Sequence, residues 1–127
     1  MQFVEITNEA GAVIEIPVHQ VSYAMKLPME REYILALRGA AMKVNGAASP
    51  FDPLVKKLLE ATDVDFKIFP IPEGTDAVVN PENMLFMTSV ELGKTALMYS
   101  GGIKIVVNEG INTVRGKLTG KSIIQES

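Results

Sequence analysis

The stretch FVEITNEAGAVIEI, residues 3–16, contains the pattern that decides the fold class. Two short runs rich in valine and isoleucine flank a polar segment at residues 8–11, and Gly11 can adopt the positive φ angle that a tight turn needs. Alternation of apolar and polar residues with a period of two is typical of half-buried β-strands. The stretch therefore predicts a β-hairpin formed by residues 3–7 and 12–16.

Three more strands are predicted after this hairpin. Residues 21–27 and 33–38 flank a polar loop that begins with Pro28, a residue that cannot continue a central strand. Gly39 then separates the fourth strand from a fifth one at residues 42–44. The first part of the chain thus reads as a five-stranded meander.

A short helix is predicted to follow the meander. Apolar residues recur at the three- and four-residue spacing of a helix face, and Asp52 and Pro53 suit a helix N-terminus. The apolar face consists of Phe51, Leu54, Val55, Leu58 and Leu59. Residues 1–63 therefore form one β-rich unit with a helix at its C-terminal end.

The second half of the chain shows the same order of elements. Phe66 lies 63 positions after Phe3, and Gly74 lies 63 positions after Gly11. Similarity at a fixed offset indicates an internal repeat, although two stretches of alternating β sequence also align by chance. The second set of elements comprises strands at residues 66–71, 77–79, 84–90, 95–99 and 103–108 and a weaker helix through Ile111, Val114 and Leu118.

The predicted fold class is mainly β, with two tandem five-stranded, strongly bent barrel units, each followed by a short α-helix. The first unit covers residues 1–63 and the second covers residues 64–127. The connection between them is short and lacks glycine and serine, so it is not a flexible tether. We expect the two units to pack as one rigid body.

The composition limits the possible functions. The 127 residues are 47% hydrophobic and contain no cysteine, which excludes disulfides, thiolate catalysis and sulfur-ligated zinc. No apolar stretch approaches the roughly 20 residues of a membrane span, and the N-terminus shows no export signal. We therefore expect a cytoplasmic protein without a membrane partner. The net charge of −3 leaves only a local patch as a possible nucleic-acid site.

The sequence predicts no catalytic centre. His19 is the only histidine, and no nucleophile or orienting residue is recognisably associated with it. The segment GKT at residues 93–95 lacks the upstream glycine of a phosphate-binding loop and fits a β-turn better. Acidic pairs such as Asp63 and Asp65 have the spacing of solvated loop charges. We expect a non-enzymatic binding or assembly module with no cofactor and no metal.

The segment LRGAAMKV, residues 37–44, is the most suggestive of binding. It resembles the second Sm motif, in which an apolar residue, a basic residue and a glycine close one strand and an apolar run opens the next. Resemblance to the Sm-like family implies a small barrel in which Arg38 and Gly39 lie on the pore-lining loop and help to hold an RNA base. We therefore predict a site for RNA or single-stranded DNA at Arg38, Gly39 and Lys43. The alternative is that Arg38 is a solvated turn residue or a salt-bridge partner.

Assembly into oligomers is also expected. Open five-stranded barrels leave edge strands that need cover, so the chain should form a homo-oligomer, either a ring or a dimer. The second half, which includes the turn at residues 80–83 and the run GGIKIVV at residues 101–107, also resembles small β proteins of phage and flagellar-regulator type. That resemblance implies an alternative function as a phage structural or adaptor protein that binds other proteins.

Overall fold

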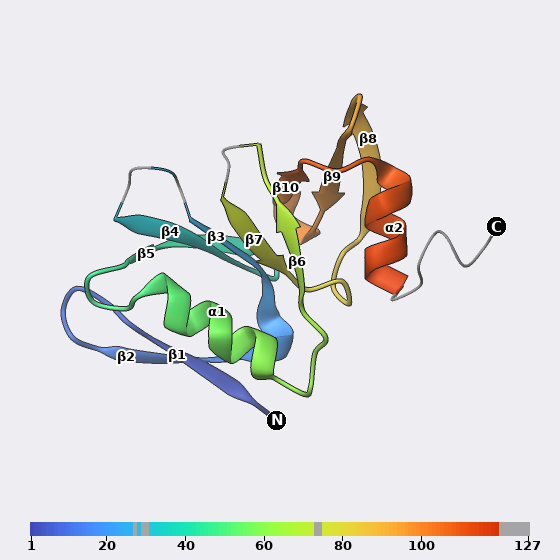
Figure 1. The fold of residues 1–127 in the computed structure, drawn as a ribbon. Helices are drawn as coiled ribbons and strands as arrows, with labels where there is room; N and C mark the ends of the chain where they lie inside the picture. Colours follow the sequence, from blue (N-terminus) through green and yellow to red (C-terminus); the bar gives the residue numbers. More distant parts are fainter. Residues whose placement is uncertain (27, 29–30, 73–74, 120–127) are drawn as a thin grey trace.

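The computed structural model describes residues 1–26, 28, 31–72 and 75–119, which form ten β-strands and two α-helices (Figure 1). The elements of the first half are β1 (Phe3–Thr7), β2 (Val13–Pro17), β3 (Val21–Lys26), β4 (Glu32–Leu37), β5 (Ala40–Asn45) and α1 (Phe51–Glu60). Those of the second half are β6 (Lys67–Pro70), β7 (Asp76–Val79), β8 (Phe86–Glu91), β9 (Lys94–Met98), β10 (Lys104–Val107) and α2 (Ile111–Thr119). Two short 3-10 turns are η1 (Val18–Gln20) and η2 (Ser100–Gly102).

The strands form three antiparallel sheets. Hairpin β1–β2 is a sheet of its own, the central sheet has the order β5-β4-β3-β7-β6, and the third sheet has the order β10-β9-β8. The central sheet joins the two halves of the chain, because β3 pairs with β7. In that pairing Tyr23 lies opposite Val79, and Met25 lies opposite Ala77.

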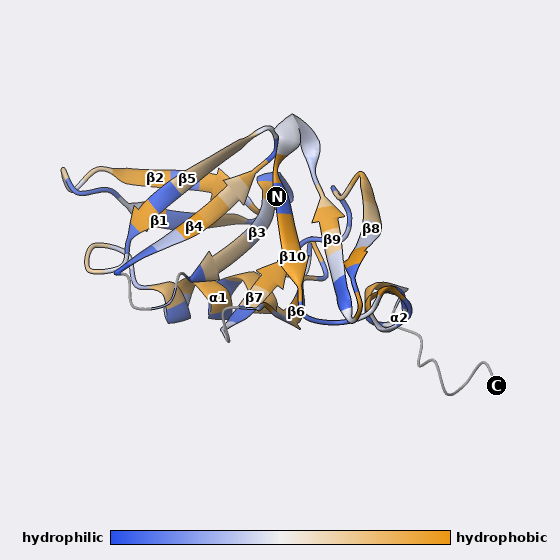
Figure 2. Ribbon diagram, turned by 90° about the horizontal axis from the view of Figure 1, so that it is seen from above, coloured by the Kyte–Doolittle hydropathy of each residue, from blue (hydrophilic) through white to orange (hydrophobic). Residues whose placement is uncertain are grey.

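The central sheet lies between the other two sheets and carries a hydrophobic core on each face (Figures 1 and 2). Its strand β4 shows why: Tyr33 and Leu35 belong to the core under α1 and hairpin β1–β2, whereas Ala36 belongs to the core under the third sheet. A near-continuous apolar run is what a strand buried on both faces requires. The two cores therefore share one wall.

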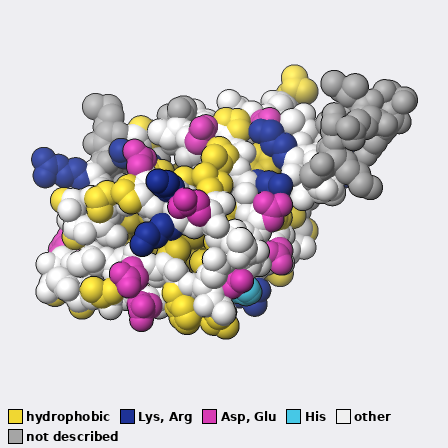
Figure 3. Space-filling view, turned by 60° about the horizontal axis from the view of Figure 1, so that its bottom comes forward, with side chains coloured by type: hydrophobic (Ala, Val, Ile, Leu, Met, Phe, Trp, Pro, Cys, Tyr) yellow, Lys and Arg dark blue, Asp and Glu magenta, His cyan; other side chains and the backbone are white. Residues whose placement is uncertain are grey.

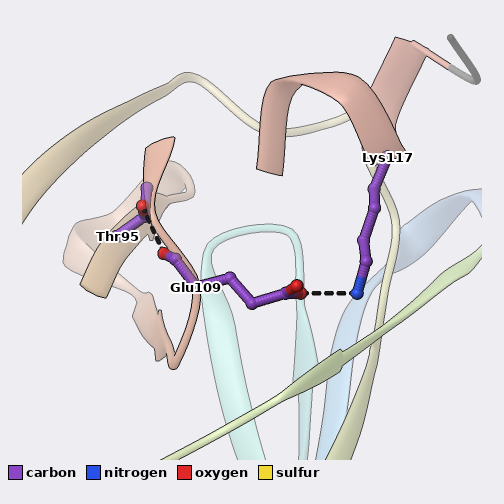
Figure 4. Close-up of polar contacts among 3 residues, drawn as sticks. All are labelled: Thr95, Glu109 and Lys117. Carbon is purple, nitrogen blue, oxygen red and sulfur yellow. Dashed lines mark hydrogen bonds and ion pairs between the residues drawn. The ribbon is translucent and has the colours of Figure 1, made fainter. Parts of the chain in front are cut away.

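The two helices close the outer ends of these cores. Leu54 and Leu58 of α1 are buried in the first core, and Val114 of α2 is buried in the second. Glu109, just before α2, contacts both β9 and the helix (Figure 4). Its backbone carbonyl accepts a hydrogen bond of 2.8 Å from Thr95 Oγ1, and its carboxylate pairs with Lys117. The ammonium group of Lys117 also lies 5.1 Å from the centre of the Phe69 ring, within the range of a cation–π contact.

The prediction of a mainly β fold is confirmed, and each predicted strand and helix overlaps an observed one. The prediction of two tandem Sm-like barrels is not confirmed, since none of the three sheets in the described residues closes into a barrel. The predicted internal repeat is not supported either. Hairpin β6–β7 is hydrogen-bonded to β3, whereas hairpin β1–β2 stands apart as a separate sheet. The predicted boundary between residues 63 and 64 falls between α1 and β6 and stays a prediction.

The described helices were also considered as membrane spans. In residues 1–26, 28, 31–72 and 75–119, no helix combines the length and the hydropathy that crossing a bilayer requires.

Candidate nucleic-acid interface

Arg38 and Gly39 form the tight turn between β4 and β5, and both are exposed. Gly39 has a φ of +79°, a conformation that favours glycine, so the turn places the arginine side chain at the tip of a hairpin. The backbone N–H of Arg38 donates a hydrogen bond of 2.9 Å to the carbonyl of Gln20 in η1. The turn is therefore anchored to the neighbouring connection and is not a free loop.

A second glycine presses directly against this turn. Gly101 in η2 has a φ of +78°, and a Cβ atom placed on it would lie 2.9 Å from both the Cα and the carbonyl oxygen of Gly39. Only a glycine allows the two backbones to approach so closely. Connections from the central and third sheets thus meet here. We name this region, formed by Gln20, Arg38, Gly39, Gly101 and Lys104, the Arg38 end of the molecule.

Two buried tyrosines brace the Arg38 end. Tyr23 donates a hydrogen bond of 3.0 Å to the carbonyl of Lys104, and Tyr99 donates one of 3.1 Å to the carbonyl of Asn80. Burial raises the pKa of both phenol groups, and in Tyr99 the nearby Tyr23 adds to the effect. The two hydroxyls therefore stay protonated and keep donating at neutral pH. Tyr23 thus joins β3 to the first residue of β10, and Tyr99, which directly precedes η2, is joined to the connection between β7 and β8.

The Arg38 end carries two basic side chains. Arg38 and Lys104 are exposed, and neither forms an ion pair within the described residues. Glu82, in the connection between β7 and β8, is also exposed. The chain as a whole carries a net charge of −3.

The structure does not bring Lys43 to this end. Lys43 is exposed on the edge strand β5, opposite Ile34. It lies about 10 Å along the strand from Ala40, at roughly 3.3 Å per residue. Of the three predicted site residues, Arg38 and Gly39 are adjacent and Lys43 is separate from them.

The opposite end of the central sheet also carries cations, and there acidic side chains line the same pockets. A pocket of about 480 Å³ is lined by Lys26, Arg31 and Asp52, and a neighbouring pocket adds Asp76 to Lys26 and Asp52. We name this region, formed by these four residues, the Arg31 end. On the face of the molecule seen in Figure 3, basic and acidic side chains are interspersed with apolar ones and form no continuous basic surface.

The described residues give no indication of a metal site. Residues 1–26, 28, 31–72 and 75–119 contain no group of three or more histidine, cysteine, aspartate or glutamate side chains placed to hold an ion. His19 lies in η1 with its Nδ1 atom buried and without a hydrogen-bond partner among these residues. It faces no arrangement that would make it a catalytic base.

The sequence missed three residues of the Arg38 end, Gln20, Gly101 and Lys104. The signal available was the pair of glycines at residues 101–102, which suggests a turn with unusual backbone angles. The contact with Gly39 depends on how the third sheet packs on the central one. That packing joins residues about 60 positions apart and leaves no local trace in the sequence.

This arrangement, three antiparallel sheets in layers with two flanking helices, defines a class of fold that solved structures also contain. The chain is similar over 94% of its length to the LytTr DNA-binding domain of a response regulator from Bacillus cereus, with a TM-score of 0.62 and 13% identity. The match covers 98% of that domain. No protein-family model and no curated protein sequence matches the chain.

This likeness corrects the resemblance drawn from residues 37–44 and from the second half. The fold resembles that of the LytTr domain and not an Sm-like barrel, so a ring with Arg38 at its pore has no structural basis. The suggestion of a phage structural protein is likewise wrong, since it depended on the same strand pattern. Strongly alternating short strands are common to all three kinds of protein, and the pairing of the strands is what separates them.

Proposed function

We propose that this chain is a DNA-binding domain and that the Arg38 end is part of its contact surface. The observation that carries the proposal is the likeness of fold, at a TM-score of 0.62 over 94% of the chain, to a domain described as DNA-binding. The sequence also indicated a nucleic-acid ligand, but through the resemblance of residues 37–44 to the second Sm motif. DNA now replaces RNA as the preferred ligand, and RNA and single-stranded DNA become competitors to be tested.

The charges favour the Arg38 end as the place of contact. A chain with a net charge of −3 is repelled by DNA as a whole, so binding needs a surface where cations are not balanced by acids. Arg38 and Lys104 are exposed and form no ion pair among the described residues, whereas Lys26 and Arg31 at the other end line pockets together with Asp52 and Asp76. An arginine at a hairpin tip can also reach a phosphate or the edge of a guanine with two parallel hydrogen bonds.

Rigidity adds to the case for the same surface. Arg38 is held by the hydrogen bond from its own N–H to Gln20, and Lys104 is held by Tyr23. A binding surface that is already ordered loses less entropy when the ligand arrives. The backbone at the Arg38 end is therefore prepared for contact, and only the side chains of the two cations need to be ordered.

Binding to a fluorescent duplex of mixed sequence tests the proposal. Fluorescence anisotropy at about 50 mM and about 200 mM salt should show binding that weakens steeply with salt, by a slope of roughly 0.9 for each phosphate contacted. Unlabelled single-stranded DNA and RNA of the same sequence should compete less well than the duplex. Absence of binding at the lower salt concentration would contradict the proposal.

Substitution of Arg38 tests the surface. Arg38→Ala should weaken duplex binding by about 1–2 kcal/mol, or roughly 5- to 30-fold, and should lower the salt slope by about one phosphate. Arg31→Ala is the matched control, since it removes the same exposed side chain at the other end of the sheet. If Arg31→Ala costs as much as Arg38→Ala or more, the contact surface is not the Arg38 end, although DNA binding itself would stand.

A further inference from the structure

The third sheet has an outer edge that differs from every other sheet edge in the described residues. Strand β8 is the edge strand at that side, and Figure 2 shows it at the margin of the molecule. All its residues are exposed except Met87, which is half-buried against the second core. The strand offers its backbone groups to a further strand.

The other edge strands carry residues that hinder such pairing. Charged side chains and proline on an edge are the usual protection against association between sheets. The edge strands β1, β2, β5, β6 and β10 each carry at least one, at Glu5, Glu15 with Pro17, Lys43, Lys67 with Pro70, and Lys104. From Phe86 to Val90, β8 has neither a charge nor a proline. Its only acid, Glu91, ends the strand and lies 3.7 Å from Lys94.

Apolar side chains gather along the same strand. Leu85, Phe86, Val90 and Leu92 are exposed by 63%, 56%, 48% and 103%. They make up four of the nine large apolar residues that the described chain leaves exposed. An unprotected edge that is also apolar is the typical signature of a protein interface.

We infer that β8 pairs antiparallel with β8 of a second copy, joining two third sheets into one continuous sheet. The sequence of the strand is self-complementary in the register centred on Thr88. There Thr88 lies opposite Thr88 of the second copy, and Phe86 lies opposite Val90. Met87 and Ser89 then face each other on either side of the Thr88 pair, and all of these residues are uncharged and lie in the regular part of the strand. Val90, the partner of Phe86, lies in the irregularity of β8 between Ser89 and Glu91.

The interface is small, and this sets its strength. A single pair of strands buries less than the roughly 1,200 Å² of a standard stable complex. The dimer should therefore be weak and should depend on concentration. The inference does not depend on DNA binding, because it uses neither the Arg38 end nor the Arg31 end.

Sedimentation velocity over concentrations on the order of 10 µM to 1 mM is the first test. The expected result is a shift from monomer to dimer, and Thr88→Lys should weaken that dimer at least tenfold by placing two like charges opposite each other. A monomer at every concentration would overturn the inference. So would a dimer that Thr88→Lys leaves unchanged.

A single cysteine provides a second test that does not require disruption of the strand. The chain contains no cysteine, so Thr88→Cys introduces a unique thiol. Opposite residues of an antiparallel pair lie about 4.5–5.5 Å apart at Cα, which suits a disulfide. In oxidised glutathione Thr88→Cys should form a covalent dimer at least tenfold faster than Val13→Cys, an exposed position on edge strand β2. Equal rates for the two variants would overturn the inference even if Thr88→Lys failed to fold.

Discussion

The two ends of the central sheet carry cations in different surroundings. At the Arg38 end, Arg38 lies in a turn whose Gly39 contacts Gly101, and Lys104 begins strand β10, where its carbonyl accepts a hydrogen bond from the buried Tyr23. At the Arg31 end, two exposed cations lie beside Asp52 and Asp76 around open pockets. The difference teaches that the number of basic residues is a poor guide to a polyanion site. The acids that line the pockets at the Arg31 end and the buried contacts that support the Arg38 end distinguish the two.

The largest effect should come from breaking the close approach at the Arg38 end. Gly101→Ala adds a Cβ that overlaps the backbone of Gly39 and also places alanine at a positive φ, so it should lower the free energy of unfolding by about 2–4 kcal/mol. Urea denaturation measures this loss.

Gly102→Ala is the control for that substitution. Gly102 has a φ of +73°, but a Cβ on it would meet nothing within 4 Å. It should therefore cost only about 1–2 kcal/mol, the penalty of the backbone angle alone. Equal losses for the two variants would show that the contact with Gly39 does not matter.

The next largest effect is the difference in stability between removing a buried tyrosine hydroxyl at the Arg38 end and removing one at the Arg31 end. Tyr99→Phe removes the hydrogen bond that the Asn80 carbonyl accepts from the tyrosine hydroxyl. The substitution should therefore lower the free energy of unfolding by about 1–2 kcal/mol. Tyr33 lines the pocket at the Arg31 end, and its buried hydroxyl makes no hydrogen bond of good geometry to a described residue. Burial raises the pKa of this hydroxyl, and the side chain of Ser49, which interacts with it, lowers that pKa. Tyr33→Phe should therefore change stability by less than about 0.5 kcal/mol. If thermal or urea unfolding showed a larger loss of stability for Tyr33→Phe than for Tyr99→Phe, the conclusion that Tyr99 supports the Arg38 end would be wrong.

The smallest effect concerns Lys43. Its side chain lies on β5, away from the Arg38 turn, and no described acid pairs with it. Lys43→Ala should therefore weaken duplex binding less than threefold, which is the loss of one distant charge. The anisotropy titration used for Arg38→Ala measures it. A loss as large as that for Arg38→Ala would extend the contact surface along the edge of the central sheet.

The sequence predicted the elements better than their assembly. Alternation in residues 3–16 and the helical spacing from Phe51 to Leu59 are local patterns, and both correspond to observed elements. The pairing of β3 with β7 was not predictable in the same way, because it joins residues more than 50 positions apart. The apolar run in β4 did contain a hint, since burial on both faces implies a sheet with a layer on each side.

The same difference between local pattern and assembly applies to the candidate site. Arg38 and Gly39 were recognisable as a turn because a glycine follows a strand pattern directly. Lys104 and Gly101 join them only through the packing of the third sheet on the central one. Lys43 was grouped with Arg38 because it is near in sequence. Along β5, three positions already separate Lys43 from Ala40, the first residue after the turn, by about 10 Å.

The pairing of β3 with β7 also bears on how the chain acquires its structure during synthesis. Translation completes β3 about 50 residues before β7. At roughly 5–20 residues per second, the ribosome needs about 3–10 s to supply the partner strand. During that interval the growing chain holds an unpaired strand edge that will become the middle of a sheet. An unpaired strand edge of this kind is prone to aggregation, so the nascent chain is vulnerable during this interval.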